Sequence, residues 1–199
     1  SKLKLRHVVI TSVDRDDLKN DFGAYIWSET IDKVKLTSPN CTIEVLTPDF
    51  QGYKPSLDLV FDSKPNIFSH NIECVERISK KVRVQSNWQR SLDVLKYSVE
   101  KNMTTKTGMM VGLGETDDEV FQTMSEIYSI GVKIFNIGQY LQPTIKHLKV
   151  DRYVRPDIFK KYRDFGYELG FDVVESGPLV RSSYHADEQA RKYGLSHEV

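Results

Sequence analysis

Two neighbouring hydroxyls near the end of the chain are the first candidates for chemistry. Ser182 and Ser183 lie between Arg181 and Tyr184 in the stretch "GPLVRSSYHADEQ". One interpretation is structural, because a serine oxygen can cap a helix, and "HADEQARK" predicts a helix start directly after the pair. The other is that the hydroxyls and the arginine belong to a site at the end of the last predicted strand. The stretch alone leaves both open.

A second candidate is the acidic stretch "TSVDRDD" after the first predicted strand. Asp14 and Asp16 are typical of capped turns, with Arg15 in a local ion pair. Ser12 and the acids are equally suited to bind a hydroxyl, amine or carboxylate of a small ligand. The pattern does not decide between these interpretations.

The stretch "SHNIE" combines a histidine, an amide and a carboxylate at a strand end. In an extended segment Asn71 and Glu73 point to the same side, which suits paired contacts with a ribose or an amino group. His70 alone is more often a hydrogen-bonded structural residue than a metal ligand. This stretch is a weak signal by itself.

The glycine-rich stretch "GMMVGLGET" resembles a phosphate-binding turn, but it lacks the spacing of both common nucleotide motifs. Gly112 and Gly114 would let the backbone approach a ligand, and a helix start after Thr116 would offer free N–H groups. Glycines required only by a tight turn explain the pattern slightly better. No Ser/His/Asp set or metalloprotease motif can be assembled.

Six strand-like segments precede these polar stretches, at residues 7–11, 42–47, 67–71, 105–113, 133–139 and 171–176. Residues 25–36, 89–102 and 116–131 have the pattern of helices, and Thr116 is a natural N-cap for the last of them. Alternating strands and helices predict an α/β fold with parallel strands. A doubly wound sheet and a (β/α) barrel both fit. Because parallel folds gather function at the carboxyl ends of their strands, the polar stretches predict one shared site and an enzyme.

Composition excludes several classes of protein. The 199 residues carry 28 basic and 28 acidic side chains, which argues against a surface built for nucleic acid. No apolar run reaches the roughly 18–20 residues that span a bilayer, and the stretch "SKLKLRHVVI" lacks the apolar run of a signal peptide, so secretion is not expected. Cys41 and Cys74 are too few for a disulfide scaffold and indicate free thiols. The charged segment 155–169 indicates a solvated helix face, with a docking face for an acidic partner as the alternative.

Taken together and in order, several long stretches resemble lipoyl synthase, a family of the radical S-adenosylmethionine (SAM) superfamily. The resemblance covers nearly the whole chain, on the strings "VVITSVDRDDL", "IEVLTPDFQG", "SHNIE", "TKTGMMVGLGET", "IGQYLQP", "HLKVDRYVRP" and "ESGPLVRSSYHAD". It implies a partial, six-strand (β/α) barrel of the TIM type. It also implies that residues 1–199 form one radical SAM core domain, with residues 177–199 as a C-terminal extension that carries the R-S-S-Y motif.

The resemblance implies a sulfurtransferase that inserts two sulfur atoms, at C6 and C8, into an octanoyl chain on a lysine of a carrier domain. One 4Fe–4S cluster, held by C-x3-C-x2-C, cleaves SAM to a radical that abstracts substrate hydrogen. A second 4Fe–4S cluster is consumed as the sulfur source. Its protein ligands are three cysteines and a serine of the R-S-S-Y motif.

Carried over by position, Ser183 is the expected ligand of the auxiliary cluster, with Ser182 as the fallback. An oxygen ligand is harder than thiolate and suits a cluster that must be dismantled. Five further residues fall where the family contacts SAM or shapes the substrate channel: Ser12, Asn71, Glu73, Arg83 and Gln139.

The resemblance also implies partners. These are octanoylated lipoyl carriers (the E2 subunits of 2-oxoacid dehydrogenases and the glycine cleavage H protein) and an electron donor such as ferredoxin or flavodoxin. The expected location is cytoplasmic in a bacterium and mitochondrial or plastid in a eukaryote. No nucleic acid and no membrane span are expected.

The chain departs from the family in one major respect, since neither cysteine cluster is present. We expect it to correspond to about the C-terminal two-thirds of the family, without the first strand and the N-terminal extension. The chain alone is then expected to be inactive. The alternatives are one half of a split enzyme and a non-catalytic module that binds lipoyl carriers or SAM.

Overall fold

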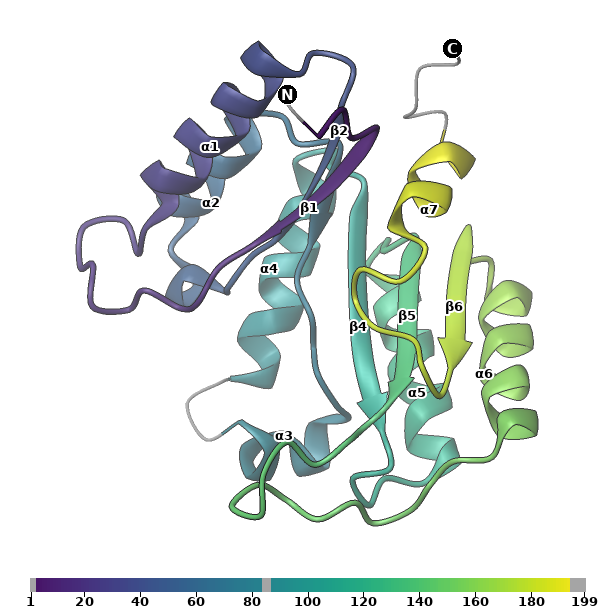
Figure 1. The fold of residues 1–199 in the computed structure, drawn as a ribbon. Coiled ribbons are helices and arrows are strands. Elements are labelled where there is room, and N and C mark those ends of the chain that lie inside the picture. Colours follow the sequence, from purple (N-terminus) through teal and green to yellow (C-terminus); the bar gives the residue numbers. More distant parts are fainter. Residues whose placement is uncertain (1–2, 84–86, 194–199) are drawn as a thin grey trace.

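Six parallel strands form the centre of the computed structural model, which describes residues 3–83 and 87–193 (Figure 1). They lie side by side in sequence order as β1 (His7–Thr11), β2 (Thr42–Leu46), β3 (Ile67–Ser69), β4 (Thr105–Val111), β5 (Ile134–Gln139) and β6 (Val173–Gly177). A doubly wound sheet would reverse its strand order near the middle. The sequential order and the open sheet therefore confirm the partial barrel and remove the alternative.

Helices connect the strands along the chain. They are α1 (Ala24–Thr37), α2 (Lys54–Asp62), α3 (Glu76–Val82), α4 (Trp88–Glu100), α5 (Asp117–Ser129), α6 (Pro156–Leu169) and α7 (Ala186–Lys192), with a single 3-10 turn, η1 (Phe50–Gly52). The predicted cap of α5 is confirmed, because the Thr116 hydroxyl accepts from the Glu119 N–H at 3.2 Å and the Glu119 carboxylate accepts from the Thr116 N–H at 2.8 Å. None of the helices among the described residues is long and apolar enough to cross a membrane.

The side chains of β5 show which face of the sheet packs against the outer helices and which face does not. Phe135 and Ile137 are fully buried in the core cluster that the outer helices share. Ile134, Asn136 and Gly138 alternate with them and therefore face the other side of the sheet. That second face is the concave one, where most of the polar groups lie.

The concave face is covered by the end of the chain. After β6 the backbone turns back across the sheet, and α7 comes to rest beside β1 (Figure 1). Ala190 of α7 packs against Ile67, Ile134 and Val173, which lie at or next to the amino ends of β3, β5 and β6. Residues 178–185 therefore run along the inside of the partial barrel.

The capping explanation for the serine pair is wrong. The residue before α7 is His185, in the left-handed region at φ 49°, and no side chain caps the helix. The two serines lie three and two residues before His185, in the turn of residues 182–185 that leads into α7.

A buried ion pair bridges the concave face between β2 and β4. Lys106 Nζ lies 3.0 Å from Glu44 Oε1, and both side chains are buried. His7 on β1 approaches the same carboxylate at 3.9 Å. Burial raises the pKa of Glu44, while the Lys106 ammonium opposes that rise. Because both side chains are buried away from water, each charge is stabilised mainly by the opposite charge of its partner.

Candidate functional site

A cavity of about 100 Å³ opens at the middle of the concave face. Strands β4 and β5, the segment after β3 and the turn after β6 all contribute to its wall. The lining residues are Asn71, Glu73, Gly108, Met109, Met110, Asn136, Gly138, Val180, Arg181 and Ser182. Three of the residues singled out from the sequence, Asn71, Glu73 and Ser182, therefore meet at one place.

Asn71 connects the segment after β3 with the turn after β6. Its Nδ2 donates a hydrogen bond of 2.8 Å to the Ser182 hydroxyl, across more than a hundred residues of sequence. Its Oδ1 is buried and has no partner among the described residues. A buried acceptor without a donor costs free energy. A ligand hydroxyl or ammonium that donated to Asn71 Oδ1 would remove this cost.

Glu73 sits in a strained backbone position beside Asn71. Its φ is 69°, a region that glutamate rarely occupies, and backbone hydrogen bonds to β4 hold it there (its N–H to Gly108 O at 3.2 Å, its carbonyl to Met110 N–H at 2.8 Å). Such strain concentrates at functional sites. Burial raises the pKa of Glu73, and the nearby Arg83 guanidinium opposes the rise.

Arg83 joins the acidic loop after β1 to this site. Its guanidinium lies 3.9 Å from Glu73 and 3.7 Å from Asp14. The structure thus brings three of the predicted cofactor residues, Asn71, Glu73 and Arg83, into one group. Their predicted contact with SAM stays a prediction.

A buried amide pair holds the turn that carries the serines. Asn136 Nδ2 donates to the carbonyls of Arg181 at 3.2 Å and Ser182 at 3.3 Å. Gln189 of α7 donates to the Tyr184 carbonyl at 2.9 Å and lies 3.5 Å from Asn136 Oδ1. Because these bonds are made to the backbone, the turn keeps its place and its side chains remain available.

Gly138 allows the turn to lie directly on β5. A Cβ at this position would stand 2.3 Å from the Val180 carbonyl oxygen, closer than real Cβ atoms approach backbone. We expect Gly138→Val to push the turn off the sheet and cost about 1–3 kcal/mol. Trypsin should then cleave after Arg181 faster than in the parent protein.

Gly177→Ala is the matched control, because a Cβ there would meet only the Val180 side chain at an ordinary 3.5 Å. Equal cleavage rates in the two variants would show that close approach at Gly138 does not hold the turn.

The two serines have different surroundings. Ser182 is half-buried and lines the cavity, with Asn71 as its donor. Ser183 is exposed, and among the described residues its one hydrogen bond is the one that its backbone carbonyl accepts from the Ala186 N–H at 3.3 Å. The expectation that Ser183 rather than Ser182 is the iron ligand is not decided by this arrangement.

Two other predicted residues lie away from the cavity. Ser12 donates to the carbonyl of Val13 at 2.9 Å and lines a separate hollow of about 370 Å³ between β1 and α1. Gln139 is buried at the end of β5, where its amide donates to the Arg152 carbonyl at 3.1 Å and accepts from the Val154 N–H at 2.8 Å. In this structure Gln139 positions the loop that follows β5.

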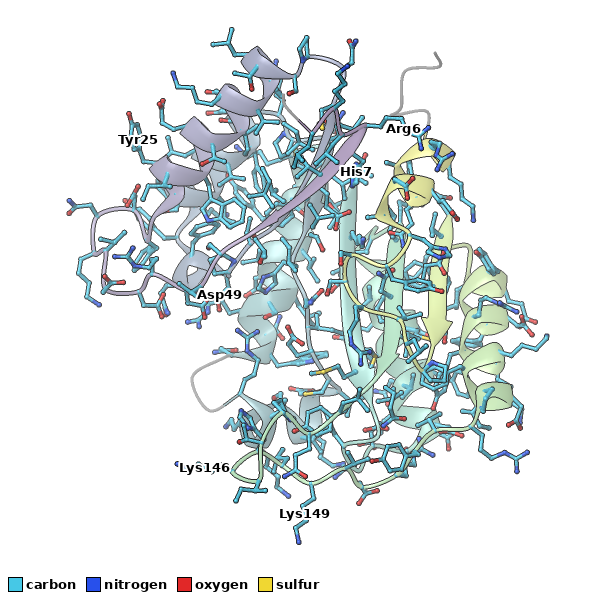
Figure 2. All side chains as sticks on the ribbon, in the orientation of Figure 1. Arg6, His7, Tyr25, Asp49, Lys146 and Lys149 are labelled. Carbon is cyan, nitrogen blue, oxygen red and sulfur yellow. The ribbon has the colours of Figure 1, made fainter. Side chains whose placement is uncertain are left out.

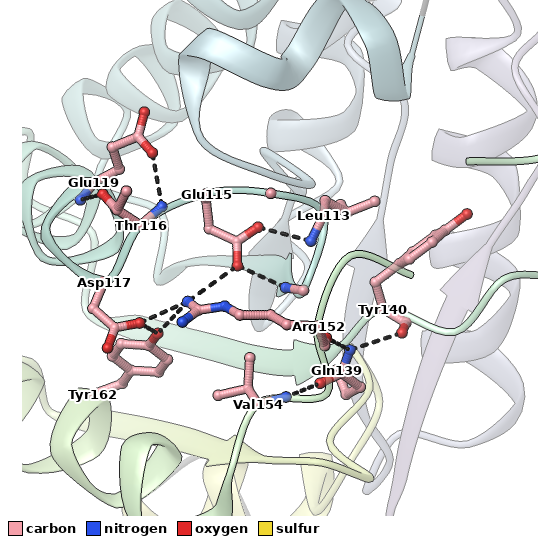
Figure 3. Close-up of polar contacts among 12 residues, drawn as sticks. Leu113, Glu115, Thr116, Asp117, Glu119, Gln139, Tyr140, Arg152, Val154 and Tyr162 are labelled. Atoms are coloured by element: carbon pink, nitrogen blue, oxygen red, sulfur yellow. Dashed lines mark hydrogen bonds and ion pairs between the residues drawn. The ribbon is translucent and has the colours of Figure 1, made fainter. Parts of the chain in front are cut away.

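In the glycine-rich turn after β4, a carboxylate of the same turn already binds the backbone N–H groups (Figure 3). Buried Glu115 accepts from the N–H groups of Gly112 at 2.7 Å and Leu113 at 2.9 Å. An external phosphate would have to displace this carboxylate. The structural interpretation of the glycines is therefore the better one.

His70 is the structural histidine that its sequence context favours. It is buried, and its two ring nitrogens lie 3.0 Å from the Thr47 carbonyl and the Ser91 hydroxyl. Both of its hydrogen-bonding positions are used, so it has none left for a ligand.

Cysteine offers no metal site in the described part of the chain. No group of three His, Cys, Asp or Glu side chains there is placed to hold a metal ion. Burial raises the pKa of Cys74 to about 12, and the neighbouring Glu73 adds to the rise. Burial also raises the pKa of the half-buried Cys41, which precedes β2. Both thiols are protonated at neutral pH.

Sequence reasoning missed Asn136, Gly138 and Gln189. A signal for the first two was present, because a polar residue and a glycine at alternate positions of a buried strand mark a face that meets something other than apolar core. Gln189 gave no local signal, since its partners lie in β5 and in the turn before α7.

Comparison with known proteins defines the class first. The model of the radical SAM superfamily matches residues 2–127. The structure of methylornithine synthase aligns with a TM-score of 0.65 at 12% identity, over 89% of this chain and 59% of that one, which shows a shared fold. Fold and family model together identify a radical SAM protein.

Closer relatives define the family. The chain is 52% identical to the lipoyl synthase of Phocaeicola vulgatus over 96% of this chain and 67% of that protein. It is 51% identical to the one of Flavobacterium johnsoniae (94% and 65%), and 49% identical to the mitochondrial one of Nematostella vectensis (94% and 64%). The chain belongs to the lipoyl synthase family. It spans about two-thirds of the length of these relatives.

Proposed function

We propose that this chain supplies the substrate and cofactor face of a lipoyl synthase, which inserts sulfur at C6 and C8 of a protein-bound N6-octanoyl-lysine to give lipoyl-lysine. Family membership supports the reaction. One observation carries the site: the R-S-S-Y turn is held on the concave face with Ser182 bonded to Asn71 beside Glu73. A hydroxyl-bearing turn and the polar side chains of Asn71 and Glu73 thus line one cavity.

The described residues suit part of a SAM molecule. The unpartnered Asn71 Oδ1 and the Glu73 carboxylate are acceptors, and SAM carries ribose hydroxyls and an ammonium as donors. When bound, SAM supplies the one-electron chemistry that removes hydrogen from the unactivated octanoyl chain. In our proposal Asn71 and Glu73 accept hydrogen bonds from it, and the Arg83 guanidinium, 3.9 Å from Glu73, opposes protonation of that carboxylate.

The described residues do not by themselves fit either 4Fe–4S cluster. They offer one serine oxygen, Ser183 with Ser182 as the alternative, and two protonated thiols that are not grouped with other ligands. Thiolates normally hold such clusters. The cysteine ligands that the family implies are absent from these 199 residues.

We expect the 199-residue chain alone to retain no stable cluster after anaerobic reconstitution with iron and sulfide. Iron counting after gel filtration measures this. The control treated in parallel is this chain joined to a cysteine-bearing N-terminal part of the family, which we call the full-length protein. Four irons per chain in the short protein, together with SAM cleavage, would contradict the expectation.

The proposal extends to partners and location. The substrates are octanoylated lipoyl domains of 2-oxoacid dehydrogenase E2 subunits and the glycine cleavage H protein, and the reductant is a ferredoxin or flavodoxin. The relatives are both bacterial and mitochondrial, which supports a cytoplasmic or an organellar setting. Residues 1–199 would act as one core domain, with 177–199 as an extension (194–199 lie outside the described residues).

Genetic complementation tests the proposal. We expect the full-length gene to restore lipoylated E2 subunits in a bacterium that lacks its own lipoyl synthase and is grown without lipoate. An antibody against lipoyl-lysine provides the readout. Stable expression without any lipoylated protein would overturn the proposed function.

A further inference from the structure

The connection between β5 and α6 is unusually long for a segment without helix or strand. It covers residues 140–155, which we call the β5–α6 loop. Connections beyond about 12–15 residues without regular structure are uncommon in compact domains and are usually functional or disordered. The contacts of this loop show which of the two applies.

The loop is fixed by its own hydrogen bonds. The Tyr140 hydroxyl donates to the Leu148 carbonyl at 2.9 Å, and Gln142 donates to the His147 carbonyl at 2.9 Å. The Thr144 hydroxyl lies 2.8 Å from the His147 ring nitrogen. These bonds close residues 142–147 into a compact turn with Ile145 and Lys146 within it.

The loop is also fixed to the body of the protein. Arg152 pairs with Asp117 at 2.6 Å, and the Tyr162 hydroxyl bonds to the same carboxylate at 2.6 Å (Figure 3). The Asp151 N–H donates to the Gly112 carbonyl at 2.9 Å, and Gln139 secures the backbone from Arg152 to Val154. The loop is therefore ordered, and its shape is set by the structure beneath it.

An ordered loop of this kind exposes an unusual set of apolar side chains. Ile145 is 95% exposed and Tyr153 74%, with Leu141 and Leu148 also exposed. Covering such a side chain is favourable because it removes apolar surface from water. The hydrogen bonds hold these side chains in water instead, which is characteristic of a surface that another molecule covers.

The same loop is positively charged in an otherwise neutral protein. Its own residues include four basic side chains, Lys146, Lys149, Arg152 and Arg155, and one acidic side chain, Asp151. Arg152 and Arg155 pair with Asp117 and Asp157 outside the loop, so the excess charge rests on the two lysines. Lys146 and Lys149 have no ion-pair partner among the residues that the structure describes, and Figure 2 shows both pointing away from the sheet. Their charge is available to an acidic partner.

The loop lies at the edge of the sheet from which, under the proposed function, the substrate would approach. It starts at the carboxyl end of β5 and touches Gly112 at the carboxyl end of β4, the edge at which parallel folds gather their sites. A lysine-bound acyl chain that enters from this edge brings its whole protein domain against the rim.

We propose that the β5–α6 loop is the docking surface for an acidic face of the folded domain that carries the substrate lysine. Ile145 would make the apolar contact, and Lys146 and Lys149 would pair with carboxylates. The inference rests on the proposed function for the identity of the substrate, and it adds the surface and the charge of the partner.

Calorimetric titration of the full-length protein with an octanoylated lipoyl domain tests the proposal. We expect Lys146→Glu/Lys149→Glu and, separately, Ile145→Asp to weaken binding at least about tenfold. The matched controls are Lys33→Glu/Lys192→Glu, two exposed lysines on α1 and α7, and Leu36→Asp, an exposed apolar residue of α1. These controls should bind like the parent protein.

Turnover of a short octanoyl-lysine peptide separates docking from chemistry. Loop variants should raise KM for the domain and leave peptide turnover unchanged, because the peptide does not reach the loop. Domain binding that depends on the lysines, without conversion of domain or peptide by any variant, would support docking and refute the proposed function. Equal affinity in loop and control variants would overturn the docking proposal, as would lysine-dependent binding of DNA or anionic vesicles without domain binding.

Discussion

Replacing Lys106 with methionine is expected to lower the free energy of unfolding by about 3–5 kcal/mol, because the substitution leaves a charged carboxylate buried without its partner. Glu44 is fully buried, and Lys106 is its only ammonium partner among the described residues. Burial lowers the pKa of His7, which disfavours its imidazolium as a replacement partner 3.9 Å from the carboxylate. Urea denaturation followed by circular dichroism measures the loss.

The loss should depend on pH with a definite sign. Burial raises the pKa of Glu44 above its ordinary 4.5, and without Lys106 nothing opposes that rise. A carboxyl whose pKa is higher in the folded than in the unfolded state destabilises the fold as pH increases beyond the unfolded value. The cost of Lys106→Met should therefore be smallest near pH 4 and grow toward pH 7.

The double variant Glu44→Gln/Lys106→Met is the control. It removes both charges, so it should be clearly more stable than Lys106→Met alone. A single-variant cost that is small and constant with pH would show that the pair does not carry the charge balance of the concave face.

If Ser183 is the cluster ligand that we propose, replacing it with alanine is expected to lower turnover of octanoyl-lysine by at least about 100-fold, since mutating even the residues that only support metal ligands typically costs 10–100-fold. We expect this loss in Ser183→Ala of the full-length protein. Ser182→Ala removes the acceptor of the Asn71 hydrogen bond and should have the smaller effect. Liquid chromatography with mass spectrometry of the peptide product gives both rates.

Electron paramagnetic resonance of the reduced clusters separates ligation from folding. A true ligand substitution changes the spectrum of one cluster and leaves the circular dichroism of the protein unchanged. If Ser182→Ala abolishes turnover and alters the spectrum while Ser183→Ala does neither, the assignment passes to Ser182, as its place in the cavity would allow. If neither variant does so, the turn has no role as a ligand.

The fold could be predicted from the sequence to a large extent. All six strands lie where alternating apolar runs predicted them, and α5 begins at the predicted Thr116 cap. These features depend on local residues, which a sequence shows directly. The choice between two α/β architectures depends on strand order, which is a long-range property and came only from the structure and the family resemblance.

The candidate site could be predicted only in part. Asn71, Glu73 and the fallback serine Ser182 line one cavity, as the shared edge of parallel strands predicts, whereas Ser183, the first choice, does not line it. Two other features depend on partners far along the chain. One is the contact of Gln139 with the β5–α6 loop, and the other is the buried amide pair of Asn136 and Gln189. Propensity and periodicity carry no information about such pairs. The hydrogen bond from the Gly112 N–H to Glu115 likewise could not be predicted, because it depends on the backbone conformation of the turn.

The measurement that tests the central proposal most directly is the mass of an octanoylated lipoyl domain after incubation with the full-length, reconstituted protein, SAM and a reductant. Sulfur insertion predicts a gain of two sulfur atoms and a loss of two hydrogens on the modified lysine, with SAM consumed. The Ser182→Ala/Ser183→Ala protein serves as the control and should yield no such product. A domain recovered at its starting mass, from protein that holds both clusters and cleaves SAM, would contradict the proposal.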